Sequence, residues 1–152
     1  MSNSIAGPGT RRRPQARSTI LPAPRALILC VERDPHLREL EEYFLHEAGF
    51  AVHFAEDGDI ALELARSLKP AIIITEILVP KRDGLALCRE LKDCAETRHT
   101  PILVFSLLAA EARAREAGAA AFLKKPLAEH RLVETVRELL RSYEAANDRQ
   151  SR

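Results

Sequence analysis

The chain has 152 residues, which is enough for one ordinary domain with a sizeable core. Its formal net charge is +1, but residues 1–25 hold five Arg and no acid, so the remaining residues sum to −4. This distribution excludes a domain that is polybasic throughout and binds nucleic acid through its whole surface. No apolar run reaches the ~20 residues of a membrane helix, and no secretory signal is recognisable, so we expect a cytoplasmic protein without a membrane partner.

Composition divides the chain into three parts. Residues 1–24 are rich in Ser, Gly, Pro and Arg, which is typical of a disordered basic arm. Residues 25–141 alternate short apolar runs with helical patterns and are predicted to form the folded domain. Residues 142–152 are polar and are predicted to form a flexible tail.

The first predicted strand is the apolar run 26–31, which is too short for a helix and is expected to be buried on both faces. A helix is predicted to begin at Asp34 and to end before Gly49. The residues predicted to form its apolar face are Leu37, Leu40, Phe44 and Ala48. Residues 51–55 form the second predicted strand. Asp57 is predicted to cap the next helix, whose apolar face is expected to comprise Ile60, Ala61, Leu64, Ala65 and Leu68.

Residues 71–75 predict the third strand, and Asp83 is expected to cap the helix that follows it. Residues 101–106 predict the fourth strand, and an Ala-rich helix ending at Gly118 comes next. Residues 120–123 predict the last strand. The last helix is expected to bury Leu132, Val133, Val136, Leu139 and Leu140. Five successive strand–helix units predict a doubly wound α/β fold, in which helices cover both faces of an open parallel sheet.

Polar side chains follow four of the predicted strands. In an open parallel sheet, ligands bind at the carboxyl ends of the strands, so these side chains are the candidate site. Each one alone is explained by a strand end that reaches water, but their joint occurrence favours a functional cluster. The residues are Glu32, Arg33 and Asp34 after the first strand, Glu76 after the third, Ser106 after the fourth, and Lys124 and Lys125 after the fifth.

Other kinds of site have weaker support. The five His show no metal-ligand spacing, and no Gly-rich phosphate loop follows the first strand. Ser106 lacks the motif of a hydrolase nucleophile, so we do not expect an enzyme.

Five segments resemble the receiver domain of two-component response regulators, in the correct order and each at the correct element. They are LILCVERDP, FAEDGDIALELA, PAIIITEILVPKRDGLALCRELK, TPILVFS and AGAAAFLKKPL, and the resemblance covers residues 25–141. It implies a flavodoxin-like sheet with strand order 2-1-3-4-5. It also implies phosphorelay signalling with a histidine kinase or another signalling protein as partner.

The resemblance assigns a position to each candidate residue. In the family, an acidic pair after the first strand holds Mg²⁺, an Asp after the third strand accepts phosphate, and a Ser or Thr and a Lys contact the phosphoryl group. Glu32 and Arg33 match the acidic pair, Glu76 the phosphoacceptor, Ser106 and Lys125 the phosphoryl contacts, and Phe122 the switch aromatic. Asp34 adjoins the acidic pair and is a further candidate for a weak metal contact.

Two residues depart from the family pattern. Arg33 stands at a metal-ligand position, and a guanidinium cannot coordinate a cation. Glu76 is longer than Asp by one methylene, which displaces the carboxylate by ~1.5 Å, and such misplacement is costly in catalysis. We therefore expect a pseudo-receiver without tight Mg²⁺ binding, in which Arg33 pairs with Glu76 in place of the metal. The alternative that Arg33 points to solvent stays open.

The interpretation is a stand-alone receiver-like domain that acts through protein contacts. One alternative is a functional phosphoacceptor that uses Glu76, and another is a nucleic-acid-associated adaptor that acts through the basic arm, although nucleic acid is not the expected partner. The surface after Ser106 is predicted to be a low-relief docking or homodimer face. The residues that define this face are Ala109, Ala110, Ala112, Ala114 and Ala117.

Overall fold

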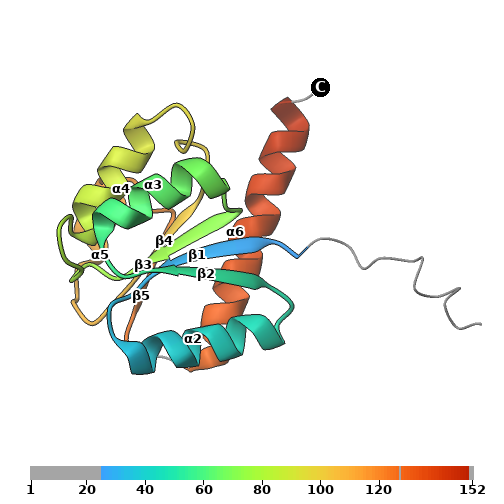
Figure 1. Cartoon of the computed structure of the whole chain (residues 1–152). Coiled ribbons are helices and arrows are strands. Elements are labelled where there is room, and N and C mark those ends of the chain that lie inside the picture. The colour runs from blue at the N-terminus through green and yellow to red at the C-terminus, as the bar shows by residue number, and fades with distance from the viewer. Residues whose placement is uncertain (1–24, 127, 151–152) are drawn as a thin grey trace, which may run out of the picture.

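The computed structural model of the chain describes residues 25–126 and 128–150 (Figure 1). Strands and helices alternate along the described chain. The elements are β1 (Leu27–Val31), α2 (Pro35–Glu47), β2 (Ala51–Ala55), α3 (Gly58–Leu68), β3 (Ile72–Thr75), α4 (Gly84–Asp93), β4 (Ile102–Ser106), α5 (Glu111–Glu116), β5 (Ala121–Lys124) and α6 (Glu129–Gln150). Residues 1–24, on which the predicted basic arm falls, lie outside the described residues. No helix among those described is both long enough and apolar enough to cross a membrane.

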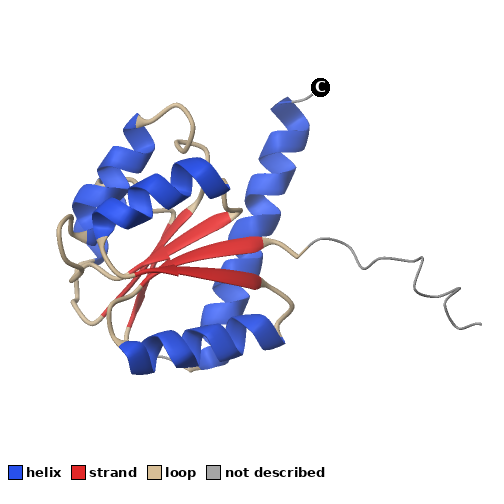
Figure 2. Cartoon of the chain, in the orientation of Figure 1, coloured by secondary structure: helices blue, strands red, loops and turns tan. Residues whose placement is uncertain are grey.

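The strands form one parallel sheet in the order β2-β1-β3-β4-β5. Figure 2 shows the twisted sheet with helices on either side of it. The doubly wound fold and the strand order 2-1-3-4-5 are therefore confirmed. Each strand connects to the next through a helix, as parallel neighbours require.

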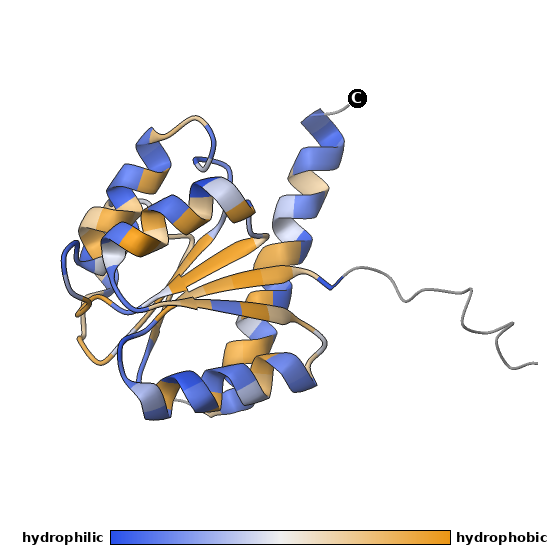
Figure 3. Ribbon diagram, viewed as in Figure 1, coloured by the Kyte–Doolittle hydropathy of each residue, from blue (hydrophilic) through white to orange (hydrophobic). Residues whose placement is uncertain are grey.

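Two apolar clusters, one on each face of the sheet, form the core. Leu29 and Val31 of β1 belong to the cluster that also holds residues of α3, α4 and α5. Ile28 and Cys30 belong to the cluster that holds residues of α2 and α6. Alternate residues of a strand point to opposite faces, so a strand covered on both sides has to be apolar throughout. Figure 3 shows this as nearly continuous orange strands beside helices of mixed colour.

Three of the helices begin at an Asp side chain, as predicted. Asp34 accepts hydrogen bonds from two N–H groups at the start of α2, Asp57 from one at the start of α3, and Asp83 from two at the start of α4. These bonds satisfy backbone donors that have no partner within the first turn of a helix.

The predicted apolar face of α2 is wrong by part of a turn. Leu40 is 51% exposed, whereas Glu41 and Leu45 are buried. The prediction omitted Glu41 because charged residues are rarely buried without a partner. In α3 the shift is smaller: Leu62, which was not predicted, is buried, and Ile60 is 40% exposed.

Two further predictions about helices need correction. Of the alanines expected to form a surface after Ser106, Ala110, Ala114 and Ala117 are buried in the core, because they lie on the inner side of α5 and its flanking turns. The predicted boundary between the domain and a tail at residue 142 falls inside a helix, since α6 continues to Gln150. Figure 1 shows its carboxyl-terminal part extending beyond the sheet.

Candidate functional site

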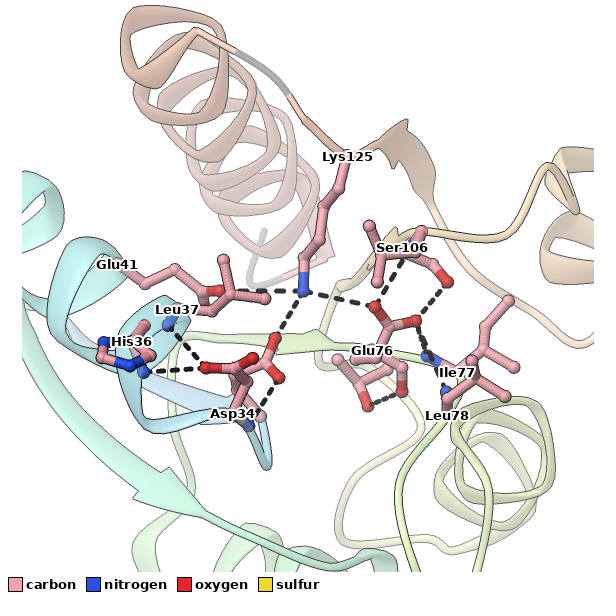
Figure 4. Close-up of polar contacts among 12 residues, drawn as sticks. Asp34, His36, Leu37, Glu41, Glu76, Ile77, Leu78, Ser106 and Lys125 are labelled. Carbon is pink, nitrogen blue, oxygen red and sulfur yellow. Dashed lines mark hydrogen bonds and ion pairs between the residues drawn. The ribbon is translucent and has the colours of Figure 1, made fainter.

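Four of the predicted site residues meet at the carboxyl edge of the sheet. Glu32, Glu76, Ser106 and Lys125 follow or end β1, β3, β4 and β5, and each is buried, with at most 5% of its surface exposed. The strand order brings these ends together because β1, β3, β4 and β5 are successive neighbours. We call these four residues, together with Glu41 of α2, the charged cluster (Figure 4).

Lys125 connects the carboxylates of the cluster. Its ammonium donates hydrogen bonds to Glu32 Oε1 and, over 3.2 Å, to Glu76 Oε2. It also lies 3.9 Å from Glu41 Oε2 and 5.0 Å from the centre of the Phe105 ring. Burial by itself lowers the pKa of Lys125, but the hydrogen bond and charge of Glu32, with the charges of Glu41 and Glu76, raise it above its usual value. Lys125 is therefore a charged side chain in the interior.

Glu76 is surrounded by hydrogen-bond donors. Its Oε1 accepts from the Ser106 hydroxyl and from the Ile77 N–H at 2.6 Å, and its Oε2 accepts from the Leu107 N–H at 3.1 Å and from Lys125. Burial alone raises the pKa of Glu76, but the Ser106 hydrogen bond, the Lys125 charge and the two backbone donors outweigh it and lower the pKa. Glu76 is consequently an ionised carboxylate.

The turn after β3 places Glu76 by close backbone packing. The Gly84 N–H donates to the Ile77 carbonyl over 2.9 Å, and the Asp83 side chain caps α4. A Cβ atom at Gly84 would lie 2.2 Å from the Glu76 carbonyl oxygen, so a larger residue cannot occupy this position without displacing the backbone. Asp83 and Gly84, which lie within the segment PAIIITEILVPKRDGLALCRELK, thus each have a structural role in this turn.

The turn after β1 places Glu32 and directs Asp34 elsewhere. Glu32 Oε2 accepts the Asp34 N–H over 3.0 Å, while its Oε1 faces Lys125. The Asp34 carboxylate accepts from the His36 N–H at 2.8 Å and from the Leu37 N–H at 3.3 Å. Asp34 is therefore a helix cap rather than a member of the charged cluster.

Glu41 is a member of the cluster that was not predicted from the sequence. Its side chain projects from the middle of α2 towards Lys125 (Figure 4), and 5% of the residue is exposed. Among the described residues, no group donates a hydrogen bond to its Oε2 atom. Burial raises the pKa of Glu41 to about 8, with the Glu32 and Glu76 charges adding to the rise and Lys125 opposing it. The signal for its burial was its position four residues after Leu37 and four before Leu45.

The predicted pairing of Arg33 with Glu76 is wrong. Arg33 is exposed and makes no hydrogen bond or ion pair with any of the residues that the structure describes. Lys125 supplies the positive charge at Glu76 instead, and Arg33 faces solvent, as the alternative interpretation held. Arg33 lines the same open cleft as Glu32 and Glu76 but bonds to neither.

Phe122 and Lys124 lie apart from the charged cluster. Phe122 is partly buried and packs against the core on the α3, α4 and α5 side of the sheet. Lys124 is exposed, and its ammonium lies 3.5 Å from the Lys125 carbonyl oxygen. The assignment of Phe122 as a switch residue stays a prediction.

The cluster does not fit a divalent cation. Both oxygens of Glu32 and of Glu76 accept hydrogen bonds, and Lys125 bonds to both side chains. A guanidinium stands at the second ligand position, and Asp34 is used as a cap. Over the described ranges, no three His, Cys, Asp or Glu side chains are arranged to hold a metal.

Comparison with known proteins identifies a family. The family model described as "Response regulator receiver domain" matches residues 28–137. The chain is 34% identical over 117 residues to the response regulator MprA of Mycolicibacterium vanbaalenii, a match covering 75% of this chain and 50% of MprA. It is 28% identical over 120 residues to the polar-differentiation response regulator DivK of Brucella anthropi, covering 77% of this chain and 97% of DivK. The chain thus spans about half the length of MprA.

A solved structure shows the same fold. The crystal structure of a putative response regulator from Chloroflexus aurantiacus matches with a TM-score of 0.74 and 31% sequence identity. The match covers 77% of this chain and 98% of that one.

Proposed function

This chain belongs to the response regulator receiver domain family of two-component signalling, and we propose that it is a pseudo-receiver. In this proposal the domain acts through contacts with a histidine kinase or another signalling protein, in the cytoplasm, without phosphorylation at Glu76.

One observation carries the proposal: the Glu76 carboxylate already accepts hydrogen bonds from the two side chains that would contact a phosphoryl group. The family resemblance assigns phosphoryl contact to Ser106 and Lys125. Here the Ser106 hydroxyl donates to Glu76 Oε1, and Lys125 Nζ lies 3.2 Å from Glu76 Oε2. The added methylene of Glu relative to Asp lets the carboxylate reach these donors itself. We infer that the internal carboxylate holds the domain in a single state.

The charges of the cluster oppose phosphorylation. A phosphoryl group would add negative charge beside the Glu32 carboxylate, with Lys125 as the one buried cation among the described residues. Phosphoryl transfer depends on positive groups aimed at the transferred oxygens. An attacking oxygen of Glu76 would first have to give up its hydrogen bond with Ser106 or with Lys125.

The test is phosphorylation by acetyl phosphate with Mg²⁺, followed by intact-mass spectrometry. We expect wild type to gain no phosphoryl group, and its amide NMR spectrum to stay unchanged. The double variant Arg33→Asp with Glu76→Asp restores the family residues and should gain a labile phosphoryl group. If wild type is labelled and Glu76→Gln is not, Glu76 is a working phosphoacceptor and the proposal fails.

A further inference from the structure

A second hollow lies beside the charged cluster, between α2, the end of β4 and the start of α6. Its volume is about 180 Å³, and apolar side chains form most of its wall. These are Leu37, Leu40, Phe44, Phe105, Leu107 and Leu132. An apolar cavity of about 150 Å³ is large enough to hold a benzene ring. This cavity therefore has the size and lining of a site for a ring-sized molecule.

The charged groups at the cavity are mainly acidic. Glu41, Glu129 and Lys125 line it, and the Lys125 ammonium is already hydrogen-bonded to Glu32 and Glu76. The Glu41 carboxyl is buried, and its Oε2 atom accepts no hydrogen bond from any described residue. Buried acceptors in folded proteins nearly always have a donor, so the Glu41 carboxyl group, which lines the cavity, lacks a partner that a ligand donor would supply.

The buried charges beside the cavity favour a positively charged ligand. Glu32, Glu41 and Glu76 are buried together, and Lys125 is the one buried cation that the described ranges supply to them. Arg33, which was predicted to pair with Glu76, is exposed and pairs with no described residue. Two carboxylates remain against one ammonium even when Glu41 carries a proton. A cation improves this balance, and an anion worsens it.

We propose that this cavity binds a small organic cation, a protonated amine carried on an apolar ring or short apolar chain. The ammonium donates to the Glu41 carboxyl group, and the apolar body packs against Phe44, Phe105 and the surrounding leucines. A hydrogen bond from a charged donor is about twice as strong as one between neutral groups, so the amine is preferred over an alcohol of the same shape. The site is distinct from the Glu76 carboxylate, and the proposal does not depend on whether Glu76 is phosphorylated.

The first test compares ligands of one shape on the full-length wild-type chain, followed by amide NMR. Benzylamine should give saturable shifts in α2 and at the end of β4, with a Kd of about 1 mM or tighter. Benzyl alcohol should bind at least about tenfold more weakly, and benzoate should give no saturable shift. Equal binding of alcohol and amine, preferred binding of benzoate, or no saturation by benzylamine would each overturn the proposal.

The second test changes the site. Glu41→Gln keeps the size of the side chain but cannot become negative, and it should weaken benzylamine binding by about tenfold. Glu42→Gln, at the exposed neighbouring position of the same helix, is the matched control and should bind as wild type does. Leu40→Ser changes the cavity wall at a residue that is 51% exposed, so the fold should tolerate it, and it should weaken benzylamine binding. Unchanged binding in both Glu41→Gln and Leu40→Ser contradicts the assignment.

Discussion

Glu76 and Glu41 are equally buried, at 5% exposure each, yet their carboxyl groups have opposite properties. The pKa of Glu76 is lowered, whereas that of Glu41 is raised to about 8. Burial acts in the same direction on both groups. Donors and neighbouring charges set the two groups apart: Glu76 accepts hydrogen bonds from Ser106, Lys125 and backbone N–H groups, whereas Glu41 Oε2 accepts none from the described residues and the Glu32 and Glu76 charges raise the pKa of Glu41 further.

The position of each residue in its element explains this difference. Glu76 follows a strand, where the chain turns and the N–H groups of Ile77 and Leu107 are free to point at a side chain. Glu41 lies in the middle of α2, where backbone N–H groups are already bonded within the helix. A carboxylate at a strand end can therefore be stabilised locally. A carboxylate on the inner face of a helix depends on distant side chains, here Lys125.

The largest expected change in stability follows from removing Lys125, the cation that lies beside both Glu76 and Glu41. Lys125→Met leaves Glu32 and Glu76 buried without their ammonium partner, and the loss should be ~3–5 kcal/mol of the free energy of unfolding. Urea denaturation at neutral pH measures it. Lys124→Met, at the exposed preceding residue, is the matched control and should be nearly neutral. Similar stability of both variants would show that Lys125 does not hold the cluster together.

The next largest effect is the pH dependence of stability, which differs for Glu41 and Glu76 because their pKa values shift in opposite directions. The pKa of Glu41 is raised from 4.5 to about 8 in the folded protein, so the fold retains the proton more strongly than the unfolded chain does. Its contribution is fully present below about pH 4 and is lost as pH rises towards 8. Relative to Glu41→Gln, wild type should lose ~2–4 kcal/mol of stability between about pH 5 and pH 9. A difference that is constant over this range would exclude a protonated Glu41.

A smaller effect tests the donors of Glu76. Ser106→Ala removes the hydroxyl from a buried carboxylate and should cost ~1–3 kcal/mol at neutral pH. Because the folded-state pKa of Glu76 is lowered, its stabilisation is present above the unfolded-state pKa and is lost as pH falls through the folded-state pKa. The deficit of the variant should therefore shrink in acid. Ser67→Ala, at an exposed position of α3, is the control for urea denaturation at both pH values.

The smallest expected change in stability is that of substituting Arg33, which contacts neither Glu76 nor Glu41. Arg33→Ala should change the free energy of unfolding by less than ~0.5 kcal/mol, because the side chain is exposed and pairs with no described residue. Added Mg²⁺ should affect wild type and variant equally once ionic strength is matched with a monovalent salt. A loss above ~1 kcal/mol that Mg²⁺ partly reverses would instead support an ion pair between Arg33 and the cluster.

Local pattern alone was enough to predict the order of the elements and most of the site. Short apolar runs predicted strands buried on both faces, and Asp34, Asp57 and Asp83 predicted three helix starts, because capping depends only on neighbouring backbone. Glu32, Glu76, Ser106 and Lys125 were found because strand ends of a parallel sheet share one edge.

Only the tertiary structure decided which charges meet inside that edge. Adjacent residues after β1 point in different directions, so Glu32 enters the cluster while Arg33 faces solvent, and sequence spacing does not distinguish them. Glu41 lies on a helix whose apolar pattern fits two neighbouring faces, and the one that packs on the sheet places Glu41 beside Lys125, 84 positions along the chain. Contacts between residues so far apart depend on how elements pack, which local periodicity does not contain.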